Sequence, residues 1–324
     1  MKEIVAADIG GTHARFAIAG IDGGRVVHLG TPTTLRTADH TSLQGAWNAF
    51  AAGIGRPLPR AAGIAVAAPV QGEQLKLTNN SWIIRPSQLA QTLGLDTISL
   101  VNDFGAVAHA VAQLDEAAFS PVCGPDAPLP ARGVTAILGP GTGLGVAQLI
   151  RAGDGGYHVI ETEGGHIDFA PLDKVEDAIL QRLRIRYRRV SVERIASGMG
   201  LANIQEALAA IEGRAVEPRD ERQLWGDALG GDDSLAAGAL SRFCLSLGSV
   251  AGDIALAQGA SGVVIAGGLG LRLADRLPGS GFAERFVAKG RFERHMASLP
   301  VKLLTHPQPG LYGAAAAFAQ AHGS

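Results

Sequence analysis

The chain is poor in cysteine, aromatic residues and charge, and these shortages exclude several classes of protein. Cys123 and Cys244 lie far apart, so neither a disulfide framework nor a cysteine zinc site is expected. The formal net charge is −2 without a polybasic arm, which argues against nucleic acid as the main partner. No uninterrupted apolar stretch approaches the ~20 residues of a membrane span. A strand pattern begins almost at residue 1, which leaves no room for a signal peptide and predicts a cytoplasmic protein.

Abundant apolar residues and glycine predict a two-domain α/β protein. The 324 residues suffice for two domains, 47% of them are hydrophobic, and 44 are glycine. A strand–turn–strand pattern near residue 4 recurs near residue 134, which predicts two related lobes with mixed sheets covered by helices. Four prolines in residues 120–133 predict a loop at a domain junction. Helices are expected at 41–53, 86–93, 104–118, 174–186, 191–211, 221–229, 234–257, 282–296 and 310–320.

Two glycine turns between apolar strands are the main candidates for ligand binding. The first is Asp8-Ile9-Gly10-Gly11-Thr12, and the second is Gly141-Thr142-Gly143. Such turns expose backbone N–H groups, which bind anions, so two facing turns could clamp a polyphosphate. Asp8 could hold Mg²⁺ through water, and Arg15 could neutralise phosphate charge. The alternatives are ordinary hairpin turns and a surface ion pair for Arg15.

Asn102-Asp103, which follows an apolar strand, is the best catalytic candidate. In open α/β sheets, ligands bind at the carboxyl ends of the strands. A carboxylate at that position can accept the proton of a hydroxyl group that attacks phosphorus. The alternative is structural, because aspartate is a preferred N-cap and Asp103 would then cap a helix that begins at Phe104.

Polar residues are also concentrated between two apolar segments, from Glu161 to Phe169. Carboxylates and an imidazole together, as in Glu163 and His166, suit vicinal hydroxyl groups that both donate and accept hydrogen bonds. A metal site is an alternative for this Glu-x-x-His spacing, but no third ligand is near. A polar surface loop is the other alternative.

Three further segments have weaker signals. Glu193 by itself is an ordinary residue of a helix's first turn. Asn79, in the segment Asn79-Asn80-Ser81-Trp82, could line the same cleft, although a turn explains it nearly as well. A basic run predicts a solvated helix face, with nucleotide or subunit contact as the alternative. Its members are Arg182, Arg184, Arg186, Arg188 and Arg189.

Taken in order, these motifs resemble those of the bacterial glucokinases, a family of the hexokinase–actin–sugar kinase superfamily. The likeness covers nearly the whole chain, is specific because many independent motifs agree, and is nearest to alphaproteobacterial, Zymomonas-like glucokinases. The matching segments are D-I-G-G-T-H-A-R (8–15), L-T-N-N-S-W (77–82), V-N-D-F (101–104), G-P-G-T-G-L-G-V-A (139–147), E-G-G-H-I-D-F-A-P (163–171), V-S-V-E-R (190–194) and P-G-L-Y-G-A-A-A (309–316).

The resemblance implies a two-lobed, actin-like ATPase fold of the ribonuclease H-like kind, with a cleft between the lobes. It implies a small α/β domain of residues 1–112 plus 306–324, a large α/β domain of residues 113–305, and a homodimer. The implied reaction is the transfer of phosphate from ATP, with Mg²⁺, to O6 of D-glucose, which yields glucose 6-phosphate and ADP.

The resemblance also implies roles for the matching residues. Asp103 would be the general base on the sugar, and Asp8 with Gly10-Gly11-Thr12 would form the first phosphate site. Gly141 and Thr142 would form the second phosphate site, and Gly267-Gly268 the adenosine site. The implied sugar ligands are Asn102, Glu163, His166 and Glu193.

Two features depart from related proteins. His13 stands where many relatives carry asparagine, which leaves the hydrogen bonds at the first phosphate in question. A sister family of repressors and N-acetylsugar kinases carries a cysteine zinc cluster, which this sequence lacks.

A kinase of another hexose or N-acetylhexosamine is the first alternative function. The second is a non-catalytic sugar sensor, although a DNA-binding module has no room ahead of Asp8.

Overall fold

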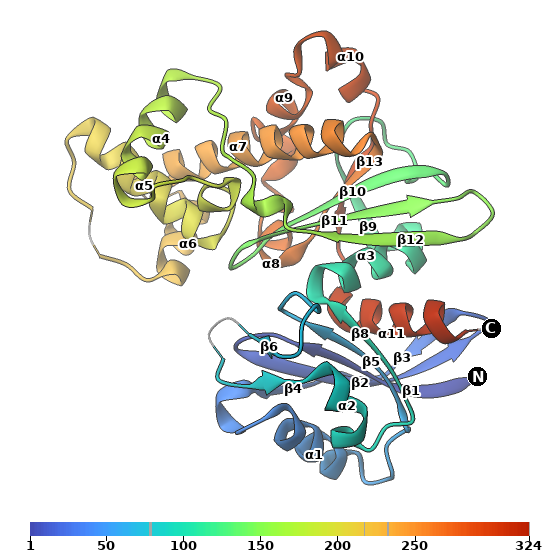
Figure 1. Cartoon of the computed structure of the whole chain (residues 1–324). Coiled ribbons are helices and arrows are strands. Elements are labelled where there is room, and N and C mark those ends of the chain that lie inside the picture. Colours follow the sequence, from blue (N-terminus) through green and yellow to red (C-terminus); the bar gives the residue numbers. More distant parts are fainter. Residues whose placement is uncertain (78–79, 217, 232, 324) are drawn as a thin grey trace. The chain divides into compact units, whose positions relative to one another are not determined.

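The computed structural model describes residues 1–77, 80–216, 218–231 and 233–323 (Figure 1). The chain divides into two compact units, each built around its own sheet. Unit 1 comprises residues 1–115 and 306–324, and unit 2 comprises residues 116–305. The sequence-based domain bounds, 1–112 with 306–324 and 113–305, lie close to these units. That the two segments fold and move as separate domains stays a prediction.

Unit 1 contains a six-stranded mixed sheet with the order β3-β2-β1-β5-β8, in which β4 pairs with β2. Its strands are β1 (Lys2–Ile9), β2 (His13–Asp22), β3 (Arg25–Leu29), β4 (Thr33–Arg36), β5 (Ala61–Val66) and β8 (Thr97–Asn102). A separate pair consists of β6 (Leu75–Lys76) and β7 (Ile83–Ile84). Because β1, β5 and β8 are parallel, Asp8 and Asn102 lie at the same edge of the sheet, where strands end.

Helices cover both faces of this sheet, as alternating side chains along β1 require. Val5 and Ala7 belong to the core that α1 (Leu43–Ile54) and α2 (Pro86–Leu93) cover. Ile4 and Ala6 belong to the core on the other face, which α11 (Pro309–His322) covers. The helix α3 (Asp103–Gln113) packs beside α11 (Figure 1).

Glycines let α11 approach the rest of unit 1 at backbone distance. A Cβ atom at Gly313 would lie 1.7 Å from the carbonyl oxygen of Ala106 in α3. A Cβ atom at Gly63 of β5 would lie 2.1 Å from the carbonyl oxygen of Ala314. Any side chain at either position would force α11 away, so these glycines fix the helix against both β5 and α3.

Unit 2 contains a second six-stranded mixed sheet, with the order β12-β11-β10-β13-β14-β9. The strands are β9 (Phe119–Cys123), β10 (Gly133–Pro140), β11 (Leu144–Arg151), β12 (Tyr157–Thr162), β13 (Ala260–Ile265) and β14 (Val301–Leu304). The helices are α4 (Lys174–Arg186), α5 (Gly198–Glu212), α6 (Glu221–Gly230), α7 (Ser234–Gln258), α8 (Gly267–Arg272), α9 (Phe282–Val287) and α10 (Glu293–Met296).

The long helix α7 is central to the core of unit 2. By length and composition it is the one helix of the described chain that could cross a membrane, but 72% of its most apolar window is buried. Its partners are side chains such as Leu201 of α5, Trp225 of α6 and Phe282 of α9, with which Phe243 and Leu247 share one apolar cluster. Burial in this core explains the apolar composition of α7.

The expected loop at residues 120–133 is partly wrong, because β9 begins at Phe119 and includes Pro121. Proline lacks the N–H group that a central strand needs, which favoured a loop. However, β9 is an edge strand that pairs only with β14, and Pro121 lies opposite Lys302. One side of an edge strand needs no partner, so proline is tolerated there.

Three of the predicted helices are shorter than expected or interrupted. The helix expected at 104–118 is α3, which ends at Gln113 and is followed by a separate 3₁₀ turn at Glu116–Ala118. The pattern at 191–211 splits into a 3₁₀ turn, η4 (Val192–Arg194), and α5, which begins at Gly198. The pattern at 282–296 splits into α9 and α10, with Gly290 between them at a φ of 56°. Such left-handed backbone is accessible to glycine and breaks a helix.

Candidate functional site

The first glycine turn connects β1 and β2 and is held from both sides. The N–H group of Gly10 donates to the carbonyl oxygen of His13 over 2.9 Å and closes the turn. Thr37, just after β4, donates from its hydroxyl to Gly11 O over 2.7 Å and from its backbone to Thr12 O over 3.0 Å. Two carbonyl groups of the turn are thereby engaged, which leaves this part of unit 1 suited to an anion.

Asp8 lies beside this turn in a largely buried position. Burial raises the pKa of its carboxyl group, and the Arg15 guanidinium, 3.4 Å from Oδ2, opposes that rise. A Cβ atom at Gly310 would lie only 2.7 Å from Asp8 Oδ2. The glycine therefore lets the first turn of α11 reach the carboxylate, and a helix N-terminus stabilises negative charge.

The possible metal ligands of unit 1 suit Mg²⁺, which is bound mainly by water and phosphate, better than a metal ion held by protein side chains alone. Among the described residues, no three His, Cys, Asp or Glu side chains lie together in a way that could hold a metal ion. Mg²⁺ bound to phosphates keeps several waters and needs only one or two protein carboxylates. Asp8 fits this requirement as a single carboxylate beside the first glycine turn.

Asn102, rather than Asp103, caps α3. Asn102 Oδ1 accepts hydrogen bonds from the N–H groups of Phe104 (2.8 Å) and Gly105 (3.4 Å), and its Nδ2 donates to Ala68 O over 3.2 Å. The alternative that Asp103 is the N-cap is therefore wrong. Asp103 is the first helical residue, and its Oδ1 accepts from the N–H group of Phe104 over 2.9 Å. Its carboxylate lies where the helix stabilises negative charge.

The second glycine turn, in unit 2, contacts Glu193 directly. The N–H group of Gly141 donates to Gly143 O over 2.8 Å, and Leu144 N donates to Glu193 Oε2 over 3.1 Å. A Cβ atom at Gly143 would lie 2.4 Å from the same carboxylate oxygen, so a side chain at this position would require the Glu193 carboxylate to shift. A predicted sugar ligand and the predicted second phosphate site are thus neighbours.

Gly267 and Gly268 also lie close to the second turn. The N–H group of Ala266 donates to Leu138 O over 2.7 Å, which brings the start of α8 to the end of β10. Gly267 has a φ of 81°, and a Cβ atom there would lie 2.8 Å from Pro140 O. A left-handed glycine is thus required where this turn passes β10.

The segment with Glu163 and His166 packs its backbone on β11 and leaves both side chains exposed. It forms a 3₁₀ turn, η3 (Gly164–His166). A Cβ atom at Gly165 would lie 2.1 Å from Leu144 O, so this glycine is needed for the close contact. The segment is therefore fixed at the level of its backbone, while a carboxylate and an imidazole stay accessible to a ligand.

Arg189 joins this segment to the one that carries Glu193. Its guanidinium donates to His166 O over 2.6 Å and forms a 2.6 Å ion pair with Asp168. The two backbones also pair, since Val192 N donates to Ile167 O over 2.9 Å. His166 and Glu193, distant in sequence, are therefore held on adjacent segments of unit 2.

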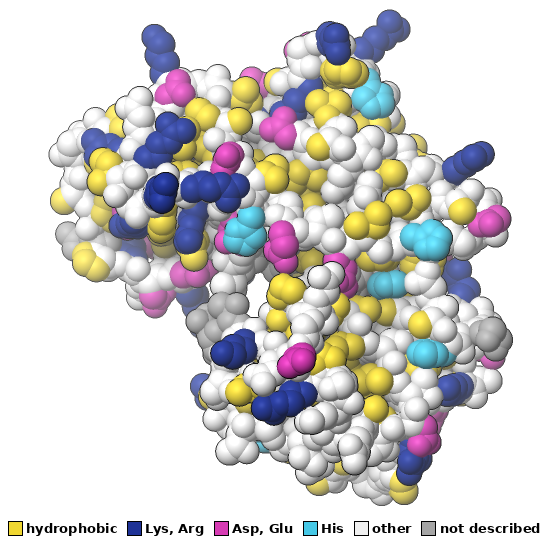
Figure 2. Space-filling view, in the orientation of Figure 1, with side chains coloured by type: hydrophobic (Ala, Val, Ile, Leu, Met, Phe, Trp, Pro, Cys, Tyr) yellow, Lys and Arg dark blue, Asp and Glu magenta, His cyan; other side chains and the backbone are white. Residues whose placement is uncertain are grey.

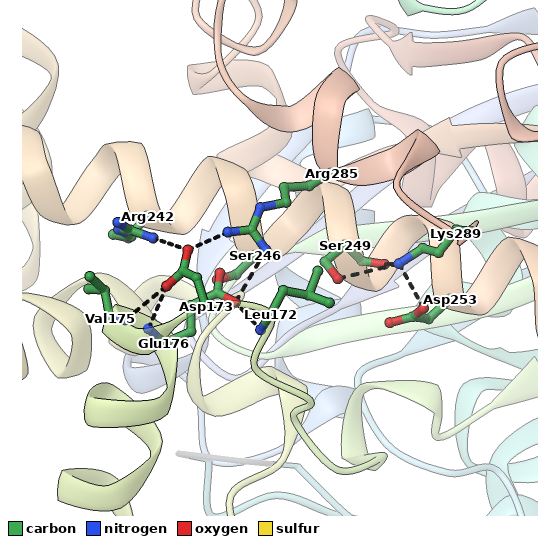
Figure 3. Close-up of polar contacts among 10 residues, drawn as sticks. All are labelled: Leu172, Asp173, Val175, Glu176, Arg242, Ser246, Ser249, Asp253, Arg285 and Lys289. Atoms are coloured by element: carbon green, nitrogen blue, oxygen red, sulfur yellow. Dashed lines mark hydrogen bonds and ion pairs between the residues drawn. The ribbon is translucent and has the colours of Figure 1, made fainter. Parts of the chain in front are cut away.

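A polar network anchors the chain just after this segment (Figure 3). Asp173 caps α4 and binds Arg242 of α7 over 2.6 Å as well as Arg285 of α9. Burial acts to raise the pKa of Asp173, but the amide of Glu176 and the two guanidinium groups hold it below its ordinary value. The buried Glu176 also accepts from Leu172 N over 2.7 Å. The chain that follows the Glu163–His166 segment is thus held against α7 and α9 by these contacts.

The basic run is more than a solvated face. Figure 2 shows Lys and Arg side chains gathered over the region of α4 and α5. Arg186 pairs with Glu206 over 2.8 Å, and Arg189 binds the loop described above. Arg184 and Arg188 are exposed, and no polar partner is found for them among the described residues.

The expected sugar ligand Asn79 lies outside the described residues.

Sequence reasoning missed Thr37, Arg189 and Gly310. Thr37 and Gly310 approach the first turn and Asp8 only through the fold, and no local pattern indicates either contact. Arg189 is indistinguishable by sequence from the other arginines of its run. A helix was expected from residue 310, but its sequence did not indicate the carboxylate beside it.

Comparisons with known proteins agree over the whole chain. The family model described as Glucokinase matches residues 5–321. The glucokinase of Zymomonas mobilis is 65% identical over 98% of this chain and 98% of its own. The crystal structure of a glucokinase from an Antarctic psychrotroph is 34% identical, with a TM-score of 0.86 and full coverage of both chains. A glucose complex of Balamuthia mandrillaris glucokinase is 20% identical, with a TM-score of 0.79, 99% coverage of this chain and 94% of its own.

These matches confirm the predicted actin-like α/β fold with mixed sheets flanked by helices. They also confirm the resemblance that the motifs indicated, because one family accounts for nearly every residue of the chain. The chain therefore belongs to the glucokinase family, the enzymes that phosphorylate glucose with ATP.

Proposed function

We propose that the chain transfers the γ-phosphoryl group of ATP to O6 of D-glucose and releases glucose 6-phosphate and ADP. The observation that carries this proposal is the 65% identity to the Zymomonas mobilis glucokinase over 98% of both chains. The local geometry of each unit supports it, since phosphoryl transfer depends on positioning and charge stabilisation more than on covalent chemistry.

The proposed sugar ligands are Asn79, Asn102, Glu163, His166 and Glu193. In unit 2, His166 and Glu193 are on segments joined by Arg189 and by backbone pairing. The exposed carboxylate of Glu163 and imidazole of His166 can accept from and donate to neighbouring hydroxyl groups of a hexose. Asn102 is rigid because its amide also caps α3.

Asp103 is the proposed general base. Its carboxylate would take the proton of the 6-hydroxyl group as O6 bonds to the γ-phosphorus and the bond from phosphorus to the ADP oxygen breaks. Two features support this role: the strand end that Asp103 follows, and its place as the first residue of α3 after the N-cap Asn102.

The proposed ATP ligands are the two glycine turns, Arg15 and Gly267-Gly268. The turns supply backbone N–H groups, and the Arg15 guanidinium can neutralise phosphate charge. Asp8 would hold Mg²⁺ through water, and the ion would supply further neutralisation of the phosphates. The proximity of Gly267 to the end of β10 supports a common nucleotide site with the second turn.

We further propose that the protein is cytoplasmic and acts as a homodimer of chains that each contain a small domain, 1–112 with 306–324, and a large domain, 113–305. Light scattering after gel filtration tests the assembly. A mass of one chain at assay concentrations would contradict the dimer.

A substrate panel tests the reaction itself. We expect the purified protein, with ATP and Mg²⁺, to show its highest kcat/KM for glucose among glucose, mannose, fructose and N-acetylglucosamine in a coupled ADP assay. A higher kcat/KM for another sugar would make the protein a kinase of that sugar. Glucose binding without turnover of any sugar would instead indicate a sensor.

A further inference from the structure

Unit 1 contains a pocket of about 290 Å³ beside the first glycine turn. Its walls come from the turn, from the end of β4 and from the segment before β7. The lining side chains that matter for its chemistry are Thr12, Arg36, Thr37, His40, Asn80 and Ser81. Gly11 also lines the pocket, and Gly11 and Thr12 belong to the first phosphate site proposed above, whereas the other residues that line the pocket do not.

Asn80, which is one of the residues that line this pocket, also carries an unsatisfied donor. Its Oδ1 accepts a hydrogen bond from Trp82 N over 2.8 Å, which identifies the remaining amide atom as the nitrogen. This Nδ2 atom is buried and has no hydrogen-bond partner among the described residues. Buried donors without partners are rare in native proteins because they cost free energy, so a water molecule or another ligand is expected to satisfy this atom.

Trp82 makes the pocket rigid before any ligand binds. Its side chain is 2% exposed in the apolar core, and its indole N–H group donates to His40 O over 2.9 Å. The same residue therefore orients the Asn80 amide through its backbone and fixes the His40 segment through its ring. A pocket whose walls are already ordered loses little entropy when a ligand binds.

The polar groups of the pocket favour an anion. Thr37 engages the carbonyl groups of Gly11 and Thr12, so these two acceptors are occupied. The Arg36 guanidinium is exposed and has no polar partner among the residues that the structure describes. Hydroxyl groups of Thr12 and Ser81 add donors, and no carboxylate of the described residues lines the pocket, although the exposed Asp39 is near in sequence.

We propose that this pocket binds a phosphate group through Asn80 Nδ2, the Arg36 guanidinium and the neighbouring hydroxyl groups. The inference rests on the proposed function, which brings phosphorylated molecules to the first glycine turn. The phosphate group could belong to a sugar phosphate, to a nucleotide or to inorganic phosphate, since all three present the same oxygens to the pocket.

Isothermal titration of the full chain with glucose 6-phosphate, ADP and inorganic phosphate, each used separately, tests the proposal. Asn80→Asp keeps the acceptor for Trp82 N and replaces the amide donor by a negative charge. We expect it to weaken the phosphate probe that occupies the pocket roughly tenfold or more. Arg36→Gln should weaken the same probe several-fold, while glucose affinity stays unchanged in both variants.

Arg85→Gln is the matched control, because Arg85 is an exposed arginine of unit 1 that does not line the pocket. The probe whose affinity falls in both test variants but not in the control identifies the source of the phosphate. If Asn80→Asp does not fold, as judged by circular dichroism, the exposed Arg36→Gln still decides the question. Unchanged affinity of Arg36→Gln for all three probes would overturn the proposal.

The proposed function is tested separately by the wild-type chain in the glucose assay. Wild-type glucose phosphorylation together with unchanged phosphate affinities in both variants would reject the pocket alone. Absence of glucose phosphorylation in the wild-type protein would reject the proposed function, and the titrations with inorganic phosphate would still measure whether the pocket binds the anion.

Discussion

Asp103 is the residue whose chemistry the proposed reaction needs most. We expect Asp103→Asn to lower kcat by ~10²–10⁴-fold, because a general base is removed. Glucose affinity and thermal stability should stay close to those of the wild type, since Asn102 supplies the helix cap. Steady-state kinetics, calorimetry with glucose and thermal melts provide the three measurements.

The matched control for this substitution is Asp126→Asn, which makes the same chemical change at an exposed position of unit 2. It should leave kcat unchanged. A wild-type kcat in Asp103→Asn would show that Asp103 is not the base.

We expect the Asp8 carboxyl group to be needed for activity but to lower the stability of the protein, and this loss of stability depends on pH. Burial raises its folded-state pKa, so the native state holds this proton more tightly than the unfolded chain. The charged group therefore costs stability above the folded-state pKa, and the cost disappears as the pH falls below the unfolded value near 3.8. We expect Asp8→Asn to raise Tm by a few degrees at pH 7.5, to raise it less near pH 4, and to lose activity.

Calorimetric melts of both proteins across this pH range check the prediction. Arg15→Gln is the control for loss of the ion pair, because it removes the partner but keeps the buried carboxyl group. A Tm increase in Asp8→Asn that is the same at every pH would contradict titration of Asp8 as its source.

Single residues could be predicted from the sequence where the chemistry lies in a local pattern. Asp8 and Asp103 follow apolar strands, so both could be placed at strand ends. Asn80 and Gly310 could not be found this way. Their significance comes from a hydrogen bond used by Trp82 and from a close approach to Asp8, which only tertiary packing creates.

At the scale of elements, Arg189 connects two segments that carry proposed sugar ligands. We expect Arg189→Gln to raise the KM for glucose about fivefold, the effect of losing roughly 1 kcal/mol of hydrogen bonding. The KM for ATP and kcat at saturating glucose should change little, because the glycine turns and Asp103 are untouched. Kinetics with each substrate varied in turn provide the measurement.

Arg188→Gln is the control, since Arg188 is the adjacent exposed arginine without a polar partner among the described residues. Arg189→Lys should recover only part of the affinity, because lysine cannot bind His166 O and Asp168 with the same planar group. Equal effects of the substitutions at 188 and 189 would contradict the connecting role.

The helix α3 carries a titratable group on its buried part. Burial lowers the pKa of His109 from 6.5 to about 4. The unfolded chain therefore binds this proton before the native state does, and stability is lost as the pH falls through 6.5 toward 4. We expect His109→Gln to lose less stability than the wild type between pH 7 and pH 4.5 in urea titrations.

His158→Gln changes an exposed histidine and should show the wild-type pH dependence. If His109→Gln follows the wild-type curve as well, another group is responsible for the acid sensitivity of unit 1.

Most elements could be predicted from their periodicity and their end signals. The predicted bounds of α2 and α4 match the structure, because Pro86 at the start of one and Asp173 before the other are strong helix signals. β9 was missed because the prolines around it indicate a loop, whereas its place at a sheet edge depends on β14. Pairing between distant strands has no local signature.

At the scale of the molecule, the proposed sugar ligands come from both units. If one glucose molecule binds Asn102 and Asp103 of unit 1 as well as Glu163 and Glu193 of unit 2, it favours the conformations in which both sets reach it. We expect saturating glucose to reduce the radius of gyration measured by small-angle scattering. Asp103→Asn serves as a non-turnover variant for the same experiment.

Scattering of each protein without ligand and with galactitol, which lacks the pyranose ring, provides the baseline. An unchanged radius of gyration, with glucose shown by calorimetry to be bound, would mean that the two units do not move on binding. The repeat of a strand–turn–strand pattern predicted two sheets, but no sequence pattern indicates how far two units move.

The discontinuous composition of unit 1 has a consequence for the synthesis of the protein. The ribosome makes β1, β5 and α3 first, but α11 follows unit 2, although it packs closely on β5 at Gly63 and on α3 through Gly313 and shares an apolar cluster with β1. The roughly 190 intervening residues take on the order of 10–40 s to translate at ~5–20 residues per second. During this interval the face of the sheet around Ile4 and Ala6 is not covered by α11. The nascent chain therefore exposes an apolar surface that chaperones can bind until α11 emerges.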